Sequence, residues 1–246
     1  MLLLLDYFLR LFPGLIVVVA IYLLVPQEIT VLKIFVLIFG FILMRDAMTP
    51  LNIWVFGVNG NVLWLRFIDD AFILITIGLL SLLVTLLIYF SNRHLTSNFI
   101  WFKTNSKSRS LFIGALAALL IAIPFMLPYL SIPITDRGGE VALHLLLPLL
   151  ILALFGNLLE EVLFRGFLQN YLKQEVGINK SIALSGLIFA LGHTFLAITV
   201  TNLGFWVIIF TLYEGLVCAY ISERYGLAPA TISHGLAIFI LSAGLI

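Results

Sequence analysis

The sequence contains little charge and almost no cysteine, and each shortage excludes a class of protein. Charged residues make up only 10% of the 246 residues and hydrophobic residues 63%, whereas soluble domains carry roughly 25% charged residues. Such a composition is that of an integral membrane protein. The formal net charge of +1 indicates no nucleic-acid partner. The single cysteine, Cys218, excludes an internal disulfide and any cysteine cluster for zinc or iron–sulfur binding.

Long hydrophobic runs predict an all-α fold, a polytopic membrane bundle of about eight helices. A bilayer core about 30 Å thick needs roughly 20 apolar residues per helix. No hydrophilic segment is long enough for a soluble domain, so we expect residues 1–246 to form one multi-pass domain in the cell membrane, in contact with lipid. The predicted spans are residues 5–25, 29–45, 71–91, 111–131, 141–171, 181–200, 204–222 and 229–246.

The loops predict an orientation. Segment 91–110 carries four basic residues and is the most basic loop, which places it in the cytoplasm by the positive-inside rule. Within the N-terminal part, residues 1–135, the pair Asn59–Gly60 between apolar runs predicts an interfacial β-hairpin near residues 52–68. We expect this hairpin to be a structural lid, with gating of a substrate as the alternative.

Ionisable residues inside the predicted spans are the candidate functional residues. Each costs roughly 2.5–3.5 kcal/mol to insert, and such groups usually face a bundle interior or a water-filled cavity. We expect Asp6, Arg10 and Lys33 of the first two spans to lie near the interfaces, whereas those at membrane depth all belong to spans five to eight, so the polar chemistry is concentrated in the C-terminal half. They are Glu160, Glu161, Arg165, His193, Glu214 and His234.

Helix geometry gives the two adjacent glutamates different surroundings. Neighbouring residues lie about 100° apart on a helix, whereas Glu161 and Arg165 are four residues apart and share a face. We expect these two to form a structural ion pair. Glu160 then points elsewhere, without a helical partner, and is the candidate for a general base.

The histidines extend this candidate site. Phe189 and His193 share a face of span six, and His234 lies in span eight. Glu160 together with two intramembrane histidines forms a base with hydrogen-bonding partners. Glu214 either pairs with Arg165 or lines the cavity, so we expect a structural or supporting role for it.

The motifs resemble those of a known family. The segment EEVLFRGFL, residues 160–168, is similar to the EExxxR motif of the CAAX protease and bacteriocin-processing (CPBP) family of intramembrane proteases, which includes enzymes that trim prenylated C-termini. Phe189 to His193 matches the FxxxH motif of that family, and His234 matches the histidine of its last motif. The resemblance covers about residues 140–240, which would form the catalytic core.

The resemblance implies an intramembrane endopeptidase. Glu160 would activate the attacking water with help from His193, and His234 would help to stabilise the oxyanion. The substrate would be a prenylated or membrane-associated peptide that enters from the cytosolic side. These three residues are also the ligand types of a His₂Glu zinc site. The chain has no HExxH motif, so we favour hydrolysis without a metal and keep zinc as the alternative.

One position departs from the family pattern. The last motif of the family often continues as HxxxN, but the fourth residue after His234 is Ile238, which cannot donate a hydrogen bond. Either a backbone N–H or Ser233 replaces the amide, or activity is weaker, or the chain no longer cleaves peptides. Loss of one oxyanion donor costs about 10²–10³ in rate, which slows an enzyme without abolishing its activity.

Two other functional classes stay open. The first is a non-catalytic membrane protein, an immunity or scaffold protein that keeps the protease fold and binds a peptide. The second is a transporter with Glu160 and the histidines as a proton relay. Transport is disfavoured because the ionisable residues cluster in one half of the chain, without the paired broken helices of inverted repeats.

Overall fold

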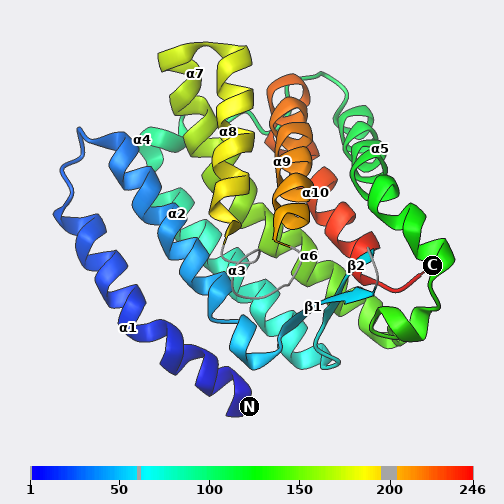
Figure 1. Cartoon of the computed structure of the whole chain (residues 1–246). Helices are drawn as coiled ribbons and strands as arrows, with labels where there is room; N and C mark the ends of the chain where they lie inside the picture. The colour runs from blue at the N-terminus through cyan, green and yellow to red at the C-terminus, as the bar shows by residue number, and fades with distance from the viewer. Residues whose placement is uncertain (1, 60–61, 195–203, 246) are drawn as a thin grey trace.

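The protein is a bundle of helices with one β-hairpin at one end, seen here in a computed structural model that describes residues 2–59, 62–194 and 204–245 (Figure 1). The α-helices are α1 (Leu2–Leu24), α2 (Thr30–Asp46), α3 (Ala71–Ser91), α4 (Arg93–Thr96), α5 (Lys107–Met126), α6 (Leu146–Glu161), α7 (Asn170–Val176), α8 (Ile178–Gly192), α9 (Phe205–Tyr225) and α10 (Leu227–Ser242). The strands are β1 (Trp54–Asn59) and β2 (Val62–Phe67), and the short 3-10 helices are η1 (Thr49–Leu51), η2 (Leu127–Ser131), η3 (Ile134–Arg137) and η4 (Leu143–Leu145).

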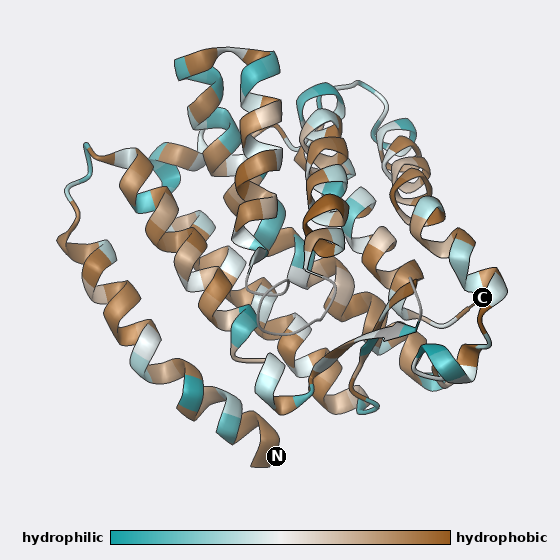
Figure 2. Ribbon diagram, in the orientation of Figure 1, coloured by the Kyte–Doolittle hydropathy of each residue, from teal (hydrophilic) through white to brown (hydrophobic). Residues whose placement is uncertain are grey.

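The all-α membrane architecture is confirmed. Within the described residues, five helical segments are long and apolar enough to cross a bilayer: Leu2–Leu24, Ala71–Ser91, Lys107–Ser131, Leu143–Val176 and Phe205–Tyr225. Many large hydrophobic side chains on the outer helices are exposed, and in Figure 2 hydrophobic residues dominate along the helices while hydrophilic ones gather at the two ends of the bundle. An apolar outer surface of this extent is a membrane surface.

The predicted number of eight spans is not confirmed. Helices α8 and α10 have 15 and 16 residues and are shorter than a full span. Helix α2 occupies the predicted second span with 17 residues. Residues 195–200 of the predicted sixth span lie outside the described residues.

The two ends of the bundle differ. At one end lie α4, α7 and the junction of α9 with α10 (Figure 1). There Lys103 and Lys173 both pair with Glu223, at 3.2 Å and 2.6 Å. At the opposite end lies the hairpin, where Tyr129 donates a hydrogen bond to the carbonyl of Leu63. The basic loops 91–110 and 173–180 therefore share one end of the molecule, as the predicted orientation requires.

The predicted hairpin is present, and its register decides which side chains face inward. The strands are antiparallel, with Trp54 opposite Phe67 and Phe56 opposite Leu65. Asn59 pairs with Val62 and so belongs to a strand, while residues 60 and 61 lie outside the described residues. Because side chains alternate between the two faces of a strand, both pairs named first lie on the same face.

A π-helical segment, η5 (Val162–Gln169), continues α6 directly after the two glutamates. All eight of its residues are buried, and it packs in a cluster of apolar side chains from α2, α6 and α8. A π-helical turn widens the helix and rotates the side chains that follow it, and such turns are frequent at functional sites. The EExxxR segment therefore spans the junction between an α-helix and a π-helix.

Candidate active site

The two glutamates at the end of α6 face different partners, as the sequence predicts. Glu161 lies 3.2 Å from Nη1 of Arg165, so the predicted ion pair is confirmed. Glu160 faces a cavity and α2 instead, where its Oε1 lies 2.7 Å from Nη2 of Arg45. Both carboxyl groups are almost completely buried.

Glu160 has a compensating charge, which comes from another helix. Arg45 lies in the last turn of α2, 115 residues earlier in the chain, and its guanidinium donates to one oxygen of the carboxylate. Residue 45 ends a predicted span, and no pattern in the sequence predicts its pairing with Glu160. The two residues come together only when the helices pack in the folded protein. The other oxygen of Glu160, Oε2, is buried and accepts no hydrogen bond from a described residue.

Both histidines turn their Nε2 atoms towards this free oxygen. Nε2 of His193 lies 3.6 Å and Nε2 of His234 lies 3.9 Å from Oε2 of Glu160. In each ring, Nδ1 faces an acceptor: the carbonyl of Phe189 at 2.8 Å for His193, and Oε1 of Glu161 at 2.9 Å for His234. Since carbonyls and carboxylates only accept, Nδ1 is the donor in each ring and fixes its orientation. The gaps to Glu160 suit a bridging water.

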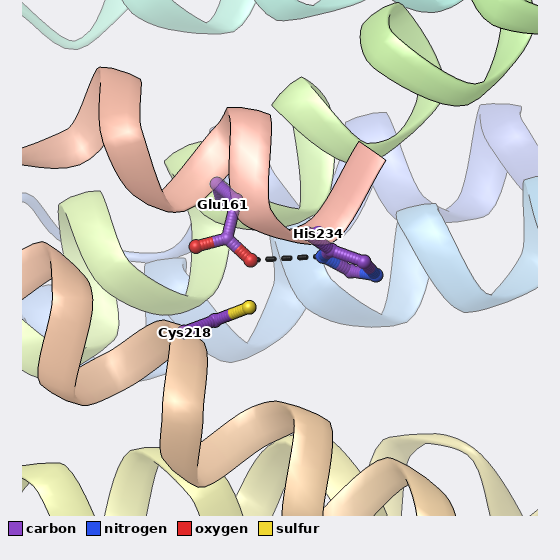
Figure 3. Close-up of side chains that lie close together, drawn as sticks. All are labelled: Glu161, Cys218 and His234. Carbon is purple, nitrogen blue, oxygen red and sulfur yellow. Dashed lines mark hydrogen bonds and ion pairs between the residues drawn. The ribbon is translucent and has the colours of Figure 1, made fainter. Parts of the chain in front are cut away.

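A buried cluster behind His234 holds that ring in place. Figure 3 shows Glu161 from α6, Cys218 from α9 and His234 from α10 pointing towards one another, with their ligand atoms all within 4.8 Å. Oε1 of Glu161 contacts both His234 and Arg165. Arg165 also donates to the carbonyl of Gly215 at 3.0 Å, and its guanidinium stacks 4.4 Å from the ring of Phe189. The predicted motif residues are thus joined into one network.

Glu214 lies near Nε2 of His234, whereas Glu161 lies near Nδ1 of the same ring. Its Oε1 is 3.6 Å from Nε2 of His234, and it lines the cavity, so the second of its two predicted positions is the one that it occupies. Three carboxyl groups, those of Glu160, Glu161 and Glu214, share the site with two guanidinium groups. One additional proton, on His234 or on Glu214, makes the cluster neutral.

A cavity of about 290 Å³ connects this group to the hairpin. Its polar end is formed by residues that include Arg45, Glu160, His193 and His234. The rest of its wall is mostly aromatic and aliphatic and comes from both strands, the end of α5, α6, α9 and α10. Trp54 would be exposed if it lay at the membrane interface, but it is only 8% exposed and lines the cavity. The hairpin is therefore a wall of the candidate site.

The position of the cavity brings two predictions into conflict. The cavity extends from Glu160 to the hairpin, at the opposite end of the bundle from the basic loops. A substrate that reaches Glu160 through it comes from the hairpin end. If the basic loops are cytoplasmic, that end is not, so the predicted orientation and the predicted access from the cytosol cannot both hold.

Two groups of side chains offer metal-ligand atoms, and among the described residues only those of Glu161, Cys218 and His234 all lie within 4.8 Å of one another. Oε2 of Glu160 and the two Nε2 atoms are the ligand types of a His₂Glu zinc site, and each ring has the second hydrogen bond that metal-bound histidines usually make. The group Glu161, Cys218 and His234 fits a metal poorly. The guanidinium of Arg165 already lies 3.2 Å from Oε1 of Glu161, and the same oxygen contacts His234.

Comparison with known proteins agrees with the resemblance of the motifs. Residues 142–240 match the family model described as type II CAAX prenyl endopeptidase Rce1-like. This range contains both glutamates, Arg165 and both histidines, but not Arg45 or the hairpin. No curated protein and no solved structure matched the chain.

Proposed function

We propose that this chain, whose residues 142–240 match the type II CAAX prenyl endopeptidase Rce1-like family model, is an intramembrane endopeptidase that uses Glu160 as its general base. The observation that carries the proposal is the free Oε2 of Glu160, buried beside two histidines at the end of an apolar cavity. A carboxylate in this position can take a proton from a water molecule held between it and His193.

The reaction would proceed as follows. The water transfers one proton to Oε2 of Glu160 and its oxygen attacks the carbonyl carbon of the peptide. An imidazolium at His234 would donate through Nδ1 to Glu161 and through Nε2 to the oxyanion, with Glu214 balancing its charge. When the C–N bond breaks, the leaving amine takes the proton from Glu160. The products are a carboxylic acid and an amine, which become a carboxylate and an ammonium group when the proton of the acid passes to the amine.

A zinc ion is the alternative electrophile at this site. Glu160, His193 and His234 would hold it, and the ion would polarise the carbonyl and acidify the bound water. The remaining groups would act as before. Glu161 would still orient the ring of His234, and the carbonyl of Phe189 would still orient His193.

The wall of the cavity favours a lipid-modified peptide as substrate. Aromatic and aliphatic side chains of the hairpin, α5 and α9 line most of the cavity, and an isoprenoid chain buries well against such a surface. The peptide bond to be cut would lie at the polar end. The family description, prenyl endopeptidase, points to the same class of substrate. We place the protein in the cell membrane.

The test is cleavage of a defined peptide by the purified full chain in lipid nanodiscs. The substrate is a farnesylated peptide that ends in a CAAX sequence, and the same peptide without the farnesyl group is the control. We expect release of the C-terminal tripeptide, detected by mass spectrometry, from the farnesylated form. Binding of the peptide without release would instead support a non-catalytic protein that keeps the protease fold.

A further inference from the structure

Arg45 contacts the carboxylate that is the proposed base, although it lies far outside the segment that matches the family. Its Nη2 donates to Oε1 of Glu160 at 2.7 Å. The guanidinium lies 5.4 Å from the ring centre of Phe41 and 6.0 Å from that of Trp54, so aromatic groups of α2 and β1 hold its plane. Its side chain is only 11% exposed, and it lines the cavity.

A glycine makes room for this contact. Gly156 lies one helical turn before Glu160 on α6 and is buried. A Cβ atom at this position would lie 2.9 Å from Nη2 and 3.4 Å from Nη1 of Arg45. A helix interior disfavours glycine, but any side chain here would push the guanidinium away from Glu160. The contact of Arg45 with Glu160 therefore depends on residues of two helices, the arginine on α2 and the small Gly156 on α6.

We propose that Arg45 is a positioning residue of the active site, which holds Oε1 of Glu160 so that Oε2 faces His193 and His234. The inference rests on the proposed function and adds to it a residue from the N-terminal half of the chain. A carboxylate can turn about its last side-chain bond, and an unheld Glu160 would have several orientations in the cavity. One charge-assisted hydrogen bond to Oε1 removes that freedom.

The first test is a set of substitutions at position 45, assayed with the farnesylated CAAX peptide. Misplacing a catalytic group by about 1 Å can cost on the order of 10²-fold in rate, so we expect Arg45→Met to lower kcat about that much and to change KM little. Arg45→Lys keeps the charge but loses the planar fork, so we expect it to recover part of the loss. Added methylguanidinium should restore part of the activity of Arg45→Ala.

The second test leaves Arg45 in place. Gly156→Ala should displace the flexible end of Arg45 rather than the backbone, because the nearest atoms to the new Cβ are those of the guanidinium. Alanine is the better helix former, so we expect an unchanged or higher melting temperature together with a kcat at least tenfold lower. A loss of activity without a loss of stability is a result that a purely structural role of Arg45 would not give.

Two matched variants serve as controls. Gly40→Ala is a glycine substitution within α2 that meets only a side-chain atom of Val18, at 3.1 Å. Arg10→Met removes an exposed arginine that pairs with Asp6. Both should keep the wild-type kcat. Wild-type kcat in Arg45→Met and Gly156→Ala would overturn the inference. Absence of cleavage by the wild-type protein would instead overturn the proposed function, so the two failures are distinguishable.

Discussion

At the scale of single residues, two neighbouring glutamates have different surroundings because each pairs with its own arginine. Glu161 is held from within its own helix by Arg165, and Glu160 is held from α2 by Arg45. Oε1 of Glu161 also accepts a hydrogen bond from His234, whereas Oε2 of Glu160 faces the cavity and accepts no hydrogen bond from a described residue. The roles assigned to the two residues follow from this difference in partners.

The ion pair of Arg165 with Glu161 gives a prediction about stability. Both side chains are 0% exposed, and removal of one member of a buried pair leaves an uncompensated charge that costs about 3–5 kcal/mol. We therefore expect Arg165→Met to lower the free energy of unfolding by about that amount, measured by denaturation in detergent. The control is Arg10→Met, whose partner lies on the surface and where we expect at most about 1 kcal/mol. Equal effects of the two substitutions would contradict a central role for the buried pair.

At the scale of elements, the hairpin contributes most of the side chains of one face to the cavity. Phe56 and Leu65 lie opposite each other across the two strands, and both line the cavity. Val55 is adjacent in sequence, but it lies on the other face and is 39% exposed. The hairpin belongs to the part of the chain that the family model does not cover.

The alternation along β1 and β2 predicts opposite outcomes for two similar substitutions. Leu65→Trp would fill part of the cavity, so we expect kcat/KM for the farnesylated peptide to fall at least about tenfold, mainly through KM. Val55→Trp adds the same bulk on the other face and should leave kcat/KM unchanged. Melting temperatures of both variants would show that the fold is retained. Similar losses in both variants, or none in either, would mean that the hairpin does not line the path of the substrate.

Residue patterns within short segments of the sequence predicted the hairpin and one ion pair of the candidate site. The hairpin follows from apolar runs around a turn signal, and the Glu161–Arg165 pair follows from a spacing of four residues. The contact of Arg45 with Glu160 has no such signal, because the residues are 115 positions apart and meet only when two helices pack. No sequence pattern predicts the role of Gly156 either, because a glycine can occur in an apolar helix for many structural reasons.

At the scale of the whole molecule, the bundle has a basic end and an opposite end that holds the hairpin and the cavity. The loops that carry Lys103 and Lys173 lie at one end, and the hairpin and the cavity lie at the other. The positive-inside rule places the first end in the cytoplasm. A substrate would then reach Glu160 from the non-cytoplasmic side, unlike the cytosolic access that the motifs imply.

Labelling of single cysteines decides the orientation. Ser131 and Asn105 are exposed, at the hairpin end and the basic end respectively, and the native Cys218 is 0% exposed. With a maleimide that does not cross membranes, added to intact cells, we expect Ser131→Cys to react and Asn105→Cys to react only after lysis. The reverse pattern would make the hairpin end cytoplasmic. It would overturn the orientation predicted from the basic loops and restore access from the cytosol.

The central claim is that Glu160 activates the water that cuts the peptide. It is tested most directly by comparing wild-type protein with Glu160→Gln in the release of the C-terminal tripeptide from the farnesylated peptide, at equal amounts of folded protein. Glutamine keeps the shape of the side chain and can still accept from Arg45, but it cannot take a proton from water. We predict that release falls at least about 10²-fold while peptide binding is retained. Release at the wild-type rate by Glu160→Gln would contradict the account.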